Sequence, residues 1–235
     1  MPVPLSISDF KMTSATCEIR YDNAYLIYDR TGQICHDLKA SFTGFKVQSP
    51  SPSQTIASAK EGSFVIEAAA SRFTTKNPDT KLEQFAIFCK QFFDVVSEGL
   101  DVKVFTRLGF RVLFRKDFRG LDEAKSAFTA LKLTTLKPTK RFGAADEPNE
   151  ILLRWEGEDI GTMWRAKAET IKIDAVLPAE LEMENSDLRK AFNALVVDVD
   201  YYTVAPVERS QWDPKEWIRH SIRTIRRDTD ALLGN

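Results

Sequence analysis

The sequence predicts an α+β fold in which antiparallel sheets are covered on one face by long amphipathic helices. Several segments alternate apolar and polar residues, which is the period of a strand with one buried face. Two longer segments repeat apolar residues every three or four positions, as a helix with one buried side does. The two halves also share a hairpin, a further strand and a long helix, although in the first half that helix precedes its strand. This shared order favours a pseudo-duplication of two halves.

The first elements are a strand, a helix and a loop. Thr13–Tyr21 alternates and predicts a strand with one buried face. From Asn23 the spacing of apolar residues becomes helical, and Gly44 closes the helix. Ser49–Gln54, with the sequence SPSPSQ, is rich in serine and proline and therefore predicts a loop.

A hairpin and the clearest helix of the chain follow the loop. Gln54–Lys60 and Ser63–Lys76 predict the two strands of the hairpin, with the turn at Glu61-Gly62. Asn77-Pro78-Asp79 starts the helix, whose apolar residues recur at three- and four-residue spacing as far as Gly99. The helix leads directly into a long predicted strand.

The second half resembles the first in its elements. Leu121–Leu133 predicts a short helix, and the residues after it read as a connection. Glu150–Glu156 and Gly161–Ile173 predict a second hairpin, and Leu195–Thr203 a further strand. The last helix, Asp213–Gly234, has an aspartate N-cap, proline at its first position and a terminating glycine.

We expect three parts along the chain. Residues 1–120 form an N-terminal α+β half, residues 121–148 a helix and linker, and residues 149–235 a C-terminal α+β half. A chain of 235 residues is long enough to bury a substantial core, either as one domain or as two that share an interface.

The composition is that of a globular protein, with 43% hydrophobic and 29% charged residues. The three cysteines, Cys17, Cys35 and Cys89, are far apart and form no CxxC motif, which favours a reducing compartment. The N-terminal residues lack the basic and apolar regions of a signal peptide, and no apolar run is long enough to span a bilayer. We therefore expect a cytoplasmic protein without a membrane partner.

Charge is unevenly distributed although the net charge is only −1. Residues 100–141 hold eleven Lys and Arg against four Asp and Glu, whereas residues 142–188 hold four against twelve. A basic segment is therefore followed by an acidic segment of similar size.

The strand predicted for Val102–Phe118 is the most informative segment, because its two faces differ in kind. Successive side chains of a strand point to opposite faces. The even positions are apolar and form a core face. The odd positions form a basic stripe that also carries Phe105 and Leu113, and its charged members are Lys103, Arg107, Arg111 and Arg115.

Three interpretations of this basic stripe are open. Opposite charges on neighbouring strands pair commonly, so the stripe is first expected to face the acidic second half of the chain. The acidic candidates there are Glu150, Glu156, Glu158 and Glu169. The other interpretations are an acidic surface of a partner protein, and nucleic acid with Phe105 stacking on a base.

The last helix carries a second row of arginines opposite its apolar stripe. Arg219, Arg223, Arg226 and Arg227 are spaced so that they share one side of the helix. Such a row suits a phosphate backbone or an acidic partner, and it also suits a solvated outer face.

Asp198 and Asp200 share one face of the strand Leu195–Thr203. Two carboxylates at this spacing are able to hold a divalent ion for hydrolysis, which makes a metal-dependent hydrolase the third hypothesis. No third ligand can be placed from the sequence, and no glycine-rich phosphate loop, GxSxG or HExxH motif is present. We therefore assign no catalytic residue, metal ligand or cofactor.

Trp164 is the tryptophan expected to be partly exposed, because both faces of its segment, TMWRAKAET, are mixed. An exposed tryptophan is a frequent anchor at protein interfaces. The alternative is a buried position at the seam between the two halves.

Three segments resemble a sporadically distributed bacterial family of uncharacterised proteins. They are FTRLGFRVLFR in the basic strand, VVDVDYY near the C-terminus, and the helix that follows WDPKEW. They cover about a third of the chain. The resemblance brings no activity or catalytic residue, and the patchy occurrence of the family implies mobile or defence-associated gene neighbourhoods.

Together these observations predict a non-enzymatic binding or adaptor subunit of a bacterial assembly, with a protein partner. The expected contact residues are Lys103, Arg107, Arg111, Arg115, Trp164, Arg219, Arg223 and Arg227. The first alternative is a nucleic-acid-binding protein that uses the same arginines.

Overall fold

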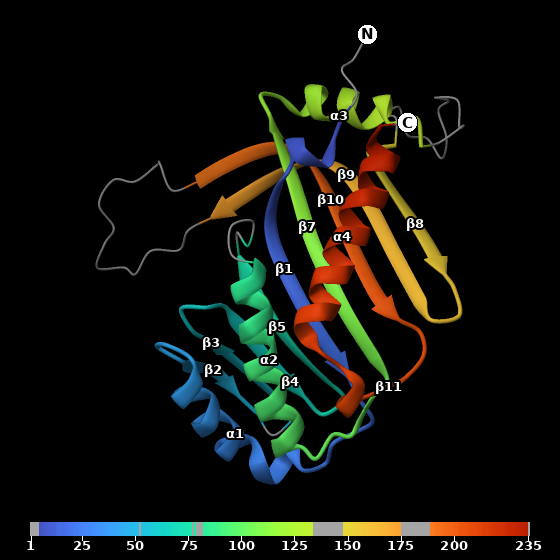
Figure 1. The fold of residues 1–235 in the computed structure, drawn as a ribbon. Helices are drawn as coiled ribbons and strands as arrows, with labels where there is room; N and C mark the ends of the chain where they lie inside the picture. Colours follow the sequence, from blue (N-terminus) through green and yellow to red (C-terminus); the bar gives the residue numbers. More distant parts are fainter. Residues whose placement is uncertain are drawn as a thin grey trace, which may run out of the picture.

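The chain folds around one nine-stranded antiparallel sheet (Figure 1). The computed structural model describes residues 5–51, 53–76, 78, 82–133, 148–174 and 189–234. Across the sheet the strands lie in the order β2 (Lys46–Pro50), β3 (Gln54–Ser58), β4 (Ser63–Glu67), β5 (Ala70–Lys76), β1 (Lys11–Arg20), β7 (Arg107–Phe118), β10 (Arg189–Thr203), β9 (Ile160–Asp174) and β8 (Glu150–Glu156). A separate two-stranded sheet joins β6 (Val104–Phe105) to β11 (Val207–Glu208). With its helices, this arrangement is the α+β class that the sequence predicts.

The helices gather on one face of the sheet, as Figure 1 shows. α2 (Leu82–Gly99) and α4 (Pro214–Leu233) contact each other, and α1 (Ile27–Ser41) packs beside α2. α3 (Leu121–Ala130) contacts β7, β9 and β10. The helices lie on this face because each strand presents its apolar side chains there, while the opposite face is polar.

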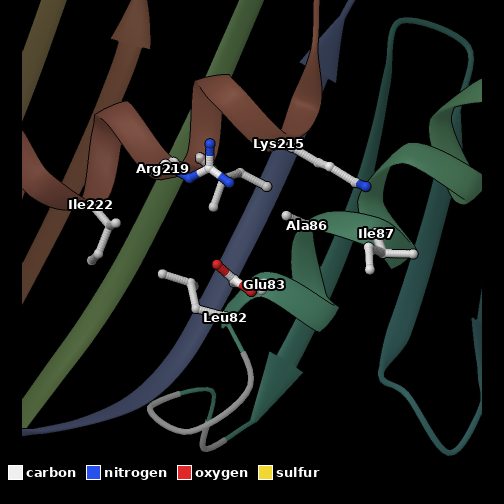
Figure 2. A pocket seen from close by; sticks show the side chains of 8 residues that line it. Leu82, Glu83, Ala86, Ile87, Lys215, Arg219 and Ile222 are labelled. Carbon is white, nitrogen blue, oxygen red and sulfur yellow. The ribbon is translucent and has the colours of Figure 1, made fainter.

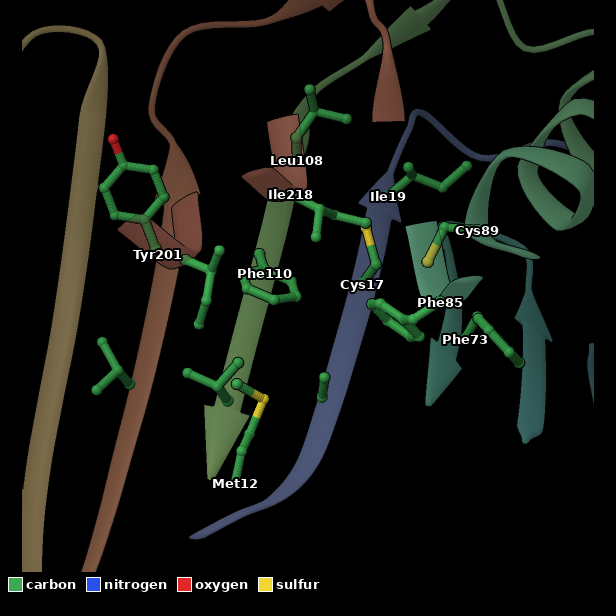
Figure 3. Packing of buried hydrophobic residues seen from close by; sticks show 14 of the residues in the cluster. Met12, Cys17, Ile19, Phe73, Phe85, Cys89, Leu108, Phe110, Tyr201 and Ile218 are labelled. Atoms are coloured by element: carbon green, nitrogen blue, oxygen red, sulfur yellow. The ribbon is translucent and has the colours of Figure 1, made fainter. Parts of the chain in front are cut away.

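Aromatic side chains fill the core between α2 and the first half of the sheet. Phe73 stacks on Phe64 with ring centroids 4.9 Å apart and on Phe85 at 5.4 Å. Cys17 and Cys89 also lie in this layer, where Figure 3 shows their side chains between β1 and α2. Burying one phenylalanine contributes about 1.5–3 kcal/mol to folding, so this cluster is a major source of stability.

Strand β7 lies at the centre of the sheet and joins its two sides. β1 pairs with β7 over Lys11–Arg20, and β7 pairs with β10 through Phe118 to Gly109. The sheet therefore continues through residues of both expected halves, 1–120 and 149–235.

Two stretches of the chain have a similar order of elements. In each, a long strand is followed by a helix, then by antiparallel strands and then by another helix, with β1 and β7 as the opening strands. The similarity of order does not by itself establish a common origin, and the pseudo-duplication stays a prediction.

The structure differs from the sequence prediction at three strands. Lys46–Pro50 forms the edge strand β2, which extends into the segment expected to be a loop. The expected strand Ser63–Lys76 is two strands, β4 and β5, which pair with each other. The alternation of the expected central strand is interrupted at Thr106, between β6 and β7, where the Thr106 amide donates to the carbonyl of Arg20.

This break reverses the orientation of Phe105. Its ring is fully buried and packs on Trp212 with centroids 5.1 Å apart, while Val104 is exposed. The expectation that Phe105 lies in the basic stripe and stacks on a base is therefore wrong. The physical reason is that β6 pairs with β11 rather than with the main sheet.

Several expectations fall outside the described residues. They concern Asn77 and Asp79 at the start of the second helix, and residues 134–147 of the expected linker. In the part of the chain that is described, no helix has both the length and the apolar character needed to cross a bilayer.

Alanine substitution at two helical glycines, Gly99 and Gly32, should change the stability of the fold in opposite directions. A Cβ at Gly99 would lie 2.5 Å from Ile34 where α2 meets α1, so Gly99→Ala should destabilise the fold by about 1–3 kcal/mol. A Cβ at Gly32 in α1 meets nothing within 4 Å, so Gly32→Ala should stabilise it by up to about 1 kcal/mol. Urea unfolding of both variants measures this difference, and a stabilising Gly99→Ala would contradict the helix contact.

Candidate functional site

The polar face of the sheet, opposite the helices, carries two ion pairs between β7 and β10. The Arg111 guanidinium donates two hydrogen bonds to Asp198, at 2.8 Å from Nε to Oδ1 and 2.6 Å from Nη2 to Oδ2. Nη2 of Arg107 donates to Oδ2 of Asp200 at 2.6 Å. The basic strand is therefore bound to its neighbour by its arginines.

The Arg111–Asp198 pair is a diagonal contact across the ladder. Arg111 lies opposite Asp200 in the register but bonds to Asp198, two residues along β10. Long side chains reach diagonal neighbours on one face of a sheet. Arg107 also lies over the ring of Tyr202, with its guanidinium carbon 4.1 Å from the ring centre. This cation–π contact orients Arg107 toward β10.

The aspartates are buried more deeply than the charge pattern suggests. The Asp198 side chain is 8% exposed, whereas that of Arg111 is 50% exposed. Burial raises the pKa of Asp200 above its ordinary value, and the nearby Arg107 opposes this effect. The hydrogen bonds to Asp198 raise the pKa of Arg111, which stays charged. Each carboxylate therefore depends on its arginine for compensation.

The expected internal pairing of the basic stripe is confirmed for Arg107 and Arg111. Their partners are the two aspartates of β10, rather than the four glutamates considered from the sequence. Arg115 pairs instead with Asp117 of its own strand, and Lys103 pairs with Asp101. These pairings leave little uncompensated positive charge on the stripe.

The same pairing removes the basis for a metal site at Asp198 and Asp200. Each of these carboxylates accepts hydrogen bonds from a guanidinium. Among the described residues, no group of three His, Cys, Asp or Glu side chains is arranged to hold a metal ion. The geometry gives the hydrolase hypothesis no support.

Trp164 lies in the core and not on the surface. It is 1% exposed and sits on β9, facing the helices beside Ala166 and Ala168. The expectation of a partly exposed Trp164 that anchors a partner is therefore wrong. Its face of β9 is covered because α4 crosses the sheet there, which no local pattern reveals.

The arginines of α4 remain near solvent. Arg219 pairs with Glu216 one turn earlier, and Arg227 pairs with the adjacent Asp228. The Arg223 Nε donates only to the carbonyl of Arg219 in its own helix. The helix begins as the sequence predicts, with Asp213 accepting a hydrogen bond from the Lys215 amide.

A groove of about 270 Å³ lies between α2 and the first turns of α4 (Figure 2). Apolar side chains of both helices form its floor, and one acidic and two basic side chains stand at its rim. Its lining residues are Leu82, Glu83, Ala86, Ile87, Lys215, Ile218, Arg219 and Ile222. It is the place where the arginine row of α4 meets exposed apolar surface.

Only the α4 side of this groove is indicated by the sequence pattern, through the arginine row and the apolar stripe of that helix. The residues Glu83 and Ile87 of α2 are one turn apart and both lie off the buried stripe, which was a usable local sign. Their juxtaposition with Arg219 depends on the packing of two helices that are far apart in the chain, so the sequence pattern contains no sign of it.

Comparison with known proteins identifies no family for this chain. No family model matches the sequence, and no curated protein matches it. Among solved structures, the di-domain ARO/CYC StfQ from the steffimycin biosynthetic pathway aligns over 94% of this chain and 96% of its own. The TM-score is 0.19 and the sequence identity 9%, which is too low a similarity to carry an argument about fold or function.

Removal of Arg111 should destabilise the protein. Arg111→Ala leaves the buried Asp198 carboxylate without its two donors, at an expected cost of about 2 kcal/mol. Arg227→Ala is the control, because that pair is exposed and should cost less than about 1 kcal/mol. Urea unfolding gives both values, and equal losses would show that the Arg111 pair is no stronger than a surface pair.

The pKa of Asp200 should lie above that of an ordinary aspartate, and the pKa of Asp230 should lie below it. Burial raises the pKa of Asp200, whereas hydrogen bonds from the amide of Ile7 and the hydroxyl of Ser6 lower that of Asp230. The stabilising contribution of Asp200 therefore falls as the pH rises through its pKa. The stabilising contribution of Asp230 is lost as the pH falls through the lowered pKa of Asp230.

Carbon-13 NMR of the two carboxyl carbons measures both pKa values in one titration. A midpoint for Asp200 at or below that of Asp230 would show that Arg107 outweighs burial.

Proposed function

We propose that the protein is a non-enzymatic binding or adaptor subunit, and that its partner inserts a short acidic amphipathic segment into the groove between α2 and α4. The observation that carries the proposal is the combination of an apolar floor with Lys215 and Arg219 at the rim. Helix-lined grooves of this kind take amphipathic segments with apolar anchors one turn apart.

The floor of the groove supplies apolar area for binding. Ile87 is 40% exposed, whereas the apolar residues Ala86, Ile218 and Ile222 of the lining are buried. Covering an isoleucine that is left in water contributes to association through the hydrophobic effect. An apolar side chain of the partner would contact Ile87 and Ala86 from one side and Ile222 from the other.

The rim favours an acidic partner. No acidic side chain of the described residues pairs with the Lys215 ammonium. Arg223, one turn beyond Arg219, likewise has no acidic partner among these residues. Glu83 is the single acid in the lining. Arg219 itself pairs with Glu216, so the cations left to complement carboxylates and to speed encounter with them are Lys215 at the rim and Arg223 one turn beyond Arg219.

The arginines of β7 are less suited to this role, because two of them already compensate buried aspartates. A phosphate backbone would have to compete with those contacts. The proposal therefore places partner binding at Arg219 and Arg223 and leaves nucleic acid as an outcome of the test.

Selection from a library of random 12-residue peptides displayed on phage tests this proposal. We expect enriched peptides to carry at least two acidic residues and apolar residues three or four positions apart. Arg219→Glu and Ile87→Asp should each weaken the binding of a selected, fluorescently labelled peptide by about tenfold, equivalent to about 1.4 kcal/mol. Fluorescence anisotropy at low and moderate salt measures the affinity.

Two matched variants serve as controls. Lys39→Glu reverses an exposed charge at the end of α1, and Val47→Asp replaces a valine that is 41% exposed on β2. Both should leave peptide affinity unchanged. Peptide binding that is insensitive to Arg219→Glu and Ile87→Asp would refute the groove. Binding of a random oligonucleotide that falls steeply with salt and is lost in Arg223→Glu would support nucleic acid instead.

A further inference from the structure

Strand β8 presents an unpaired edge at one end of the nine-stranded sheet. Its neighbour on one side is β9, and no described strand lies on its other side (Figure 1). Such an edge is a template for a strand of another chain, and proteins commonly protect it. At the opposite end of the sheet β2 is protected, because it has five residues, ends in Pro50 and carries a register shift between Val47 and Ser49. β8 has seven residues in regular register, without a proline or a bulge.

The backbone of β8 is oriented for pairing on this free edge. The Ala168 amide donates to the carbonyl of Asn149, and the Gly157 amide donates to the carbonyl of Ile160. Both bonds continue the register of β8 with β9. Bonded residues alternate along an antiparallel ladder, so the odd-numbered residues of β8 bond to β9 and the even-numbered residues direct their N–H and C=O groups outward. The outward residues are Glu150, Leu152, Arg154 and Glu156.

Apolar side chains are exposed on both sides of this edge. Leu152 is 53% exposed on the polar face of the sheet, where it lies in register with Arg165 of β9. On the helix-facing side Trp155 is 48% exposed, and it lines a hollow of about 380 Å³ beside the last turns of α4. Covering these side chains with a further strand would contribute to association through the hydrophobic effect.

The charges that flank Leu152 make β8 complementary to itself. In an antiparallel pair of two β8 strands centred on Leu152, the two leucines lie opposite each other and Glu150 lies opposite the partner's Arg154. Centring the pair on the preceding residue places Glu150 opposite the partner's Leu152, and centring it on the following residue places Glu150 opposite the partner's Glu156. Registers that oppose residues of different faces are excluded by the pleat. The register centred on Leu152 is therefore the one that charge favours.

The ion pairs already present on β8 extend across such an interface. The Arg165 Nε lies 3.0 Å from Oε1 of Glu150, and the Arg154 Nη2 lies 3.0 Å from Oε1 of Glu156. In the pair centred on Leu152, Glu150 would lie between its own Arg165 and the partner's Arg154. Charges of opposite sign then alternate across the two chains, and like charges do not meet.

We propose that two copies of this chain associate through β8 into a two-fold symmetric dimer, in which the sheet of one copy continues into the sheet of the other. Each contact is made twice, because the same strand is used by both copies. The interface is independent of the peptide groove, whose lining comes from α2 and α4.

Sedimentation equilibrium of the purified chain tests the proposal, and we expect a monomer–dimer equilibrium in the micromolar range. Glu150→Arg and Arg154→Glu should each weaken self-association at least about tenfold, because each turns both attractive contacts of the dimer into repulsive ones. An equimolar mixture of the two variants should restore association, because the two reversed charges then face each other and the two unchanged residues do so as well. A chain that stays monomeric at high micromolar concentration overturns the proposal, as does a mixture that associates no better than either variant alone.

Further variants locate the interface. Leu152→Pro removes an outward N–H without removing a bond to β9, and it should abolish association. Lys46→Glu, on the opposite edge strand β2, should leave association unchanged. Unchanged association in a folded Leu152→Pro overturns the proposal, and the mixture of charge variants decides the result if this variant does not fold. Arg219→Glu should leave the dimer intact, which separates this result from that of the peptide groove.

Discussion

The antiparallel pairing of β7 with β1 on one side and β10 on the other is the contact on which the rest of the structure depends. Its backbone hydrogen bonds bring together strands from both ends of the chain. The pairing also aligns the apolar residues of all three strands on one face, and Phe110 and Val199 thereby join the core under α2 and α4. Because only this face is apolar, the helices have one side of the sheet on which to pack.

The polar face of β7 has a different consequence. Arg107 and Arg111 bond to aspartates of β10, so the most basic strand of the chain is largely compensated from within. A buried aspartate without its arginine would be costly, which ties the arginines to a structural role. The two ends of α4 border different hollows. The first turns border a groove with a basic rim, and the last turns border an aromatic pocket.

Much of the fold followed from local patterns, and the candidate sites did so only in part. The alternation in β1 and β7 and the cap of α4 at Asp213 were predicted correctly. The edge strand β2 and the break at Thr106 were not, because both are decided by pairing with a distant strand. Asp198 and Asp200 were considered as metal ligands, although they are the partners of the basic strand. The arginines of β7 and the aspartates of β10 both recur at even spacing along their strands, and this spacing does not indicate which strands are neighbours.

The sequence by itself determined where side chains alternate, where helices start and stop, and that the central strand has one apolar and one basic face. These features depend on residues within one or two turns of each other, so they can be recognised in the chain. The tertiary structure alone decided that the basic face pairs with β10, that Trp164 is covered by α4, and that α2 and α4 enclose a groove. Each of these depends on contacts between residues about a hundred positions apart or on how a helix crosses the sheet, and strand alternation and helical spacing do not encode either.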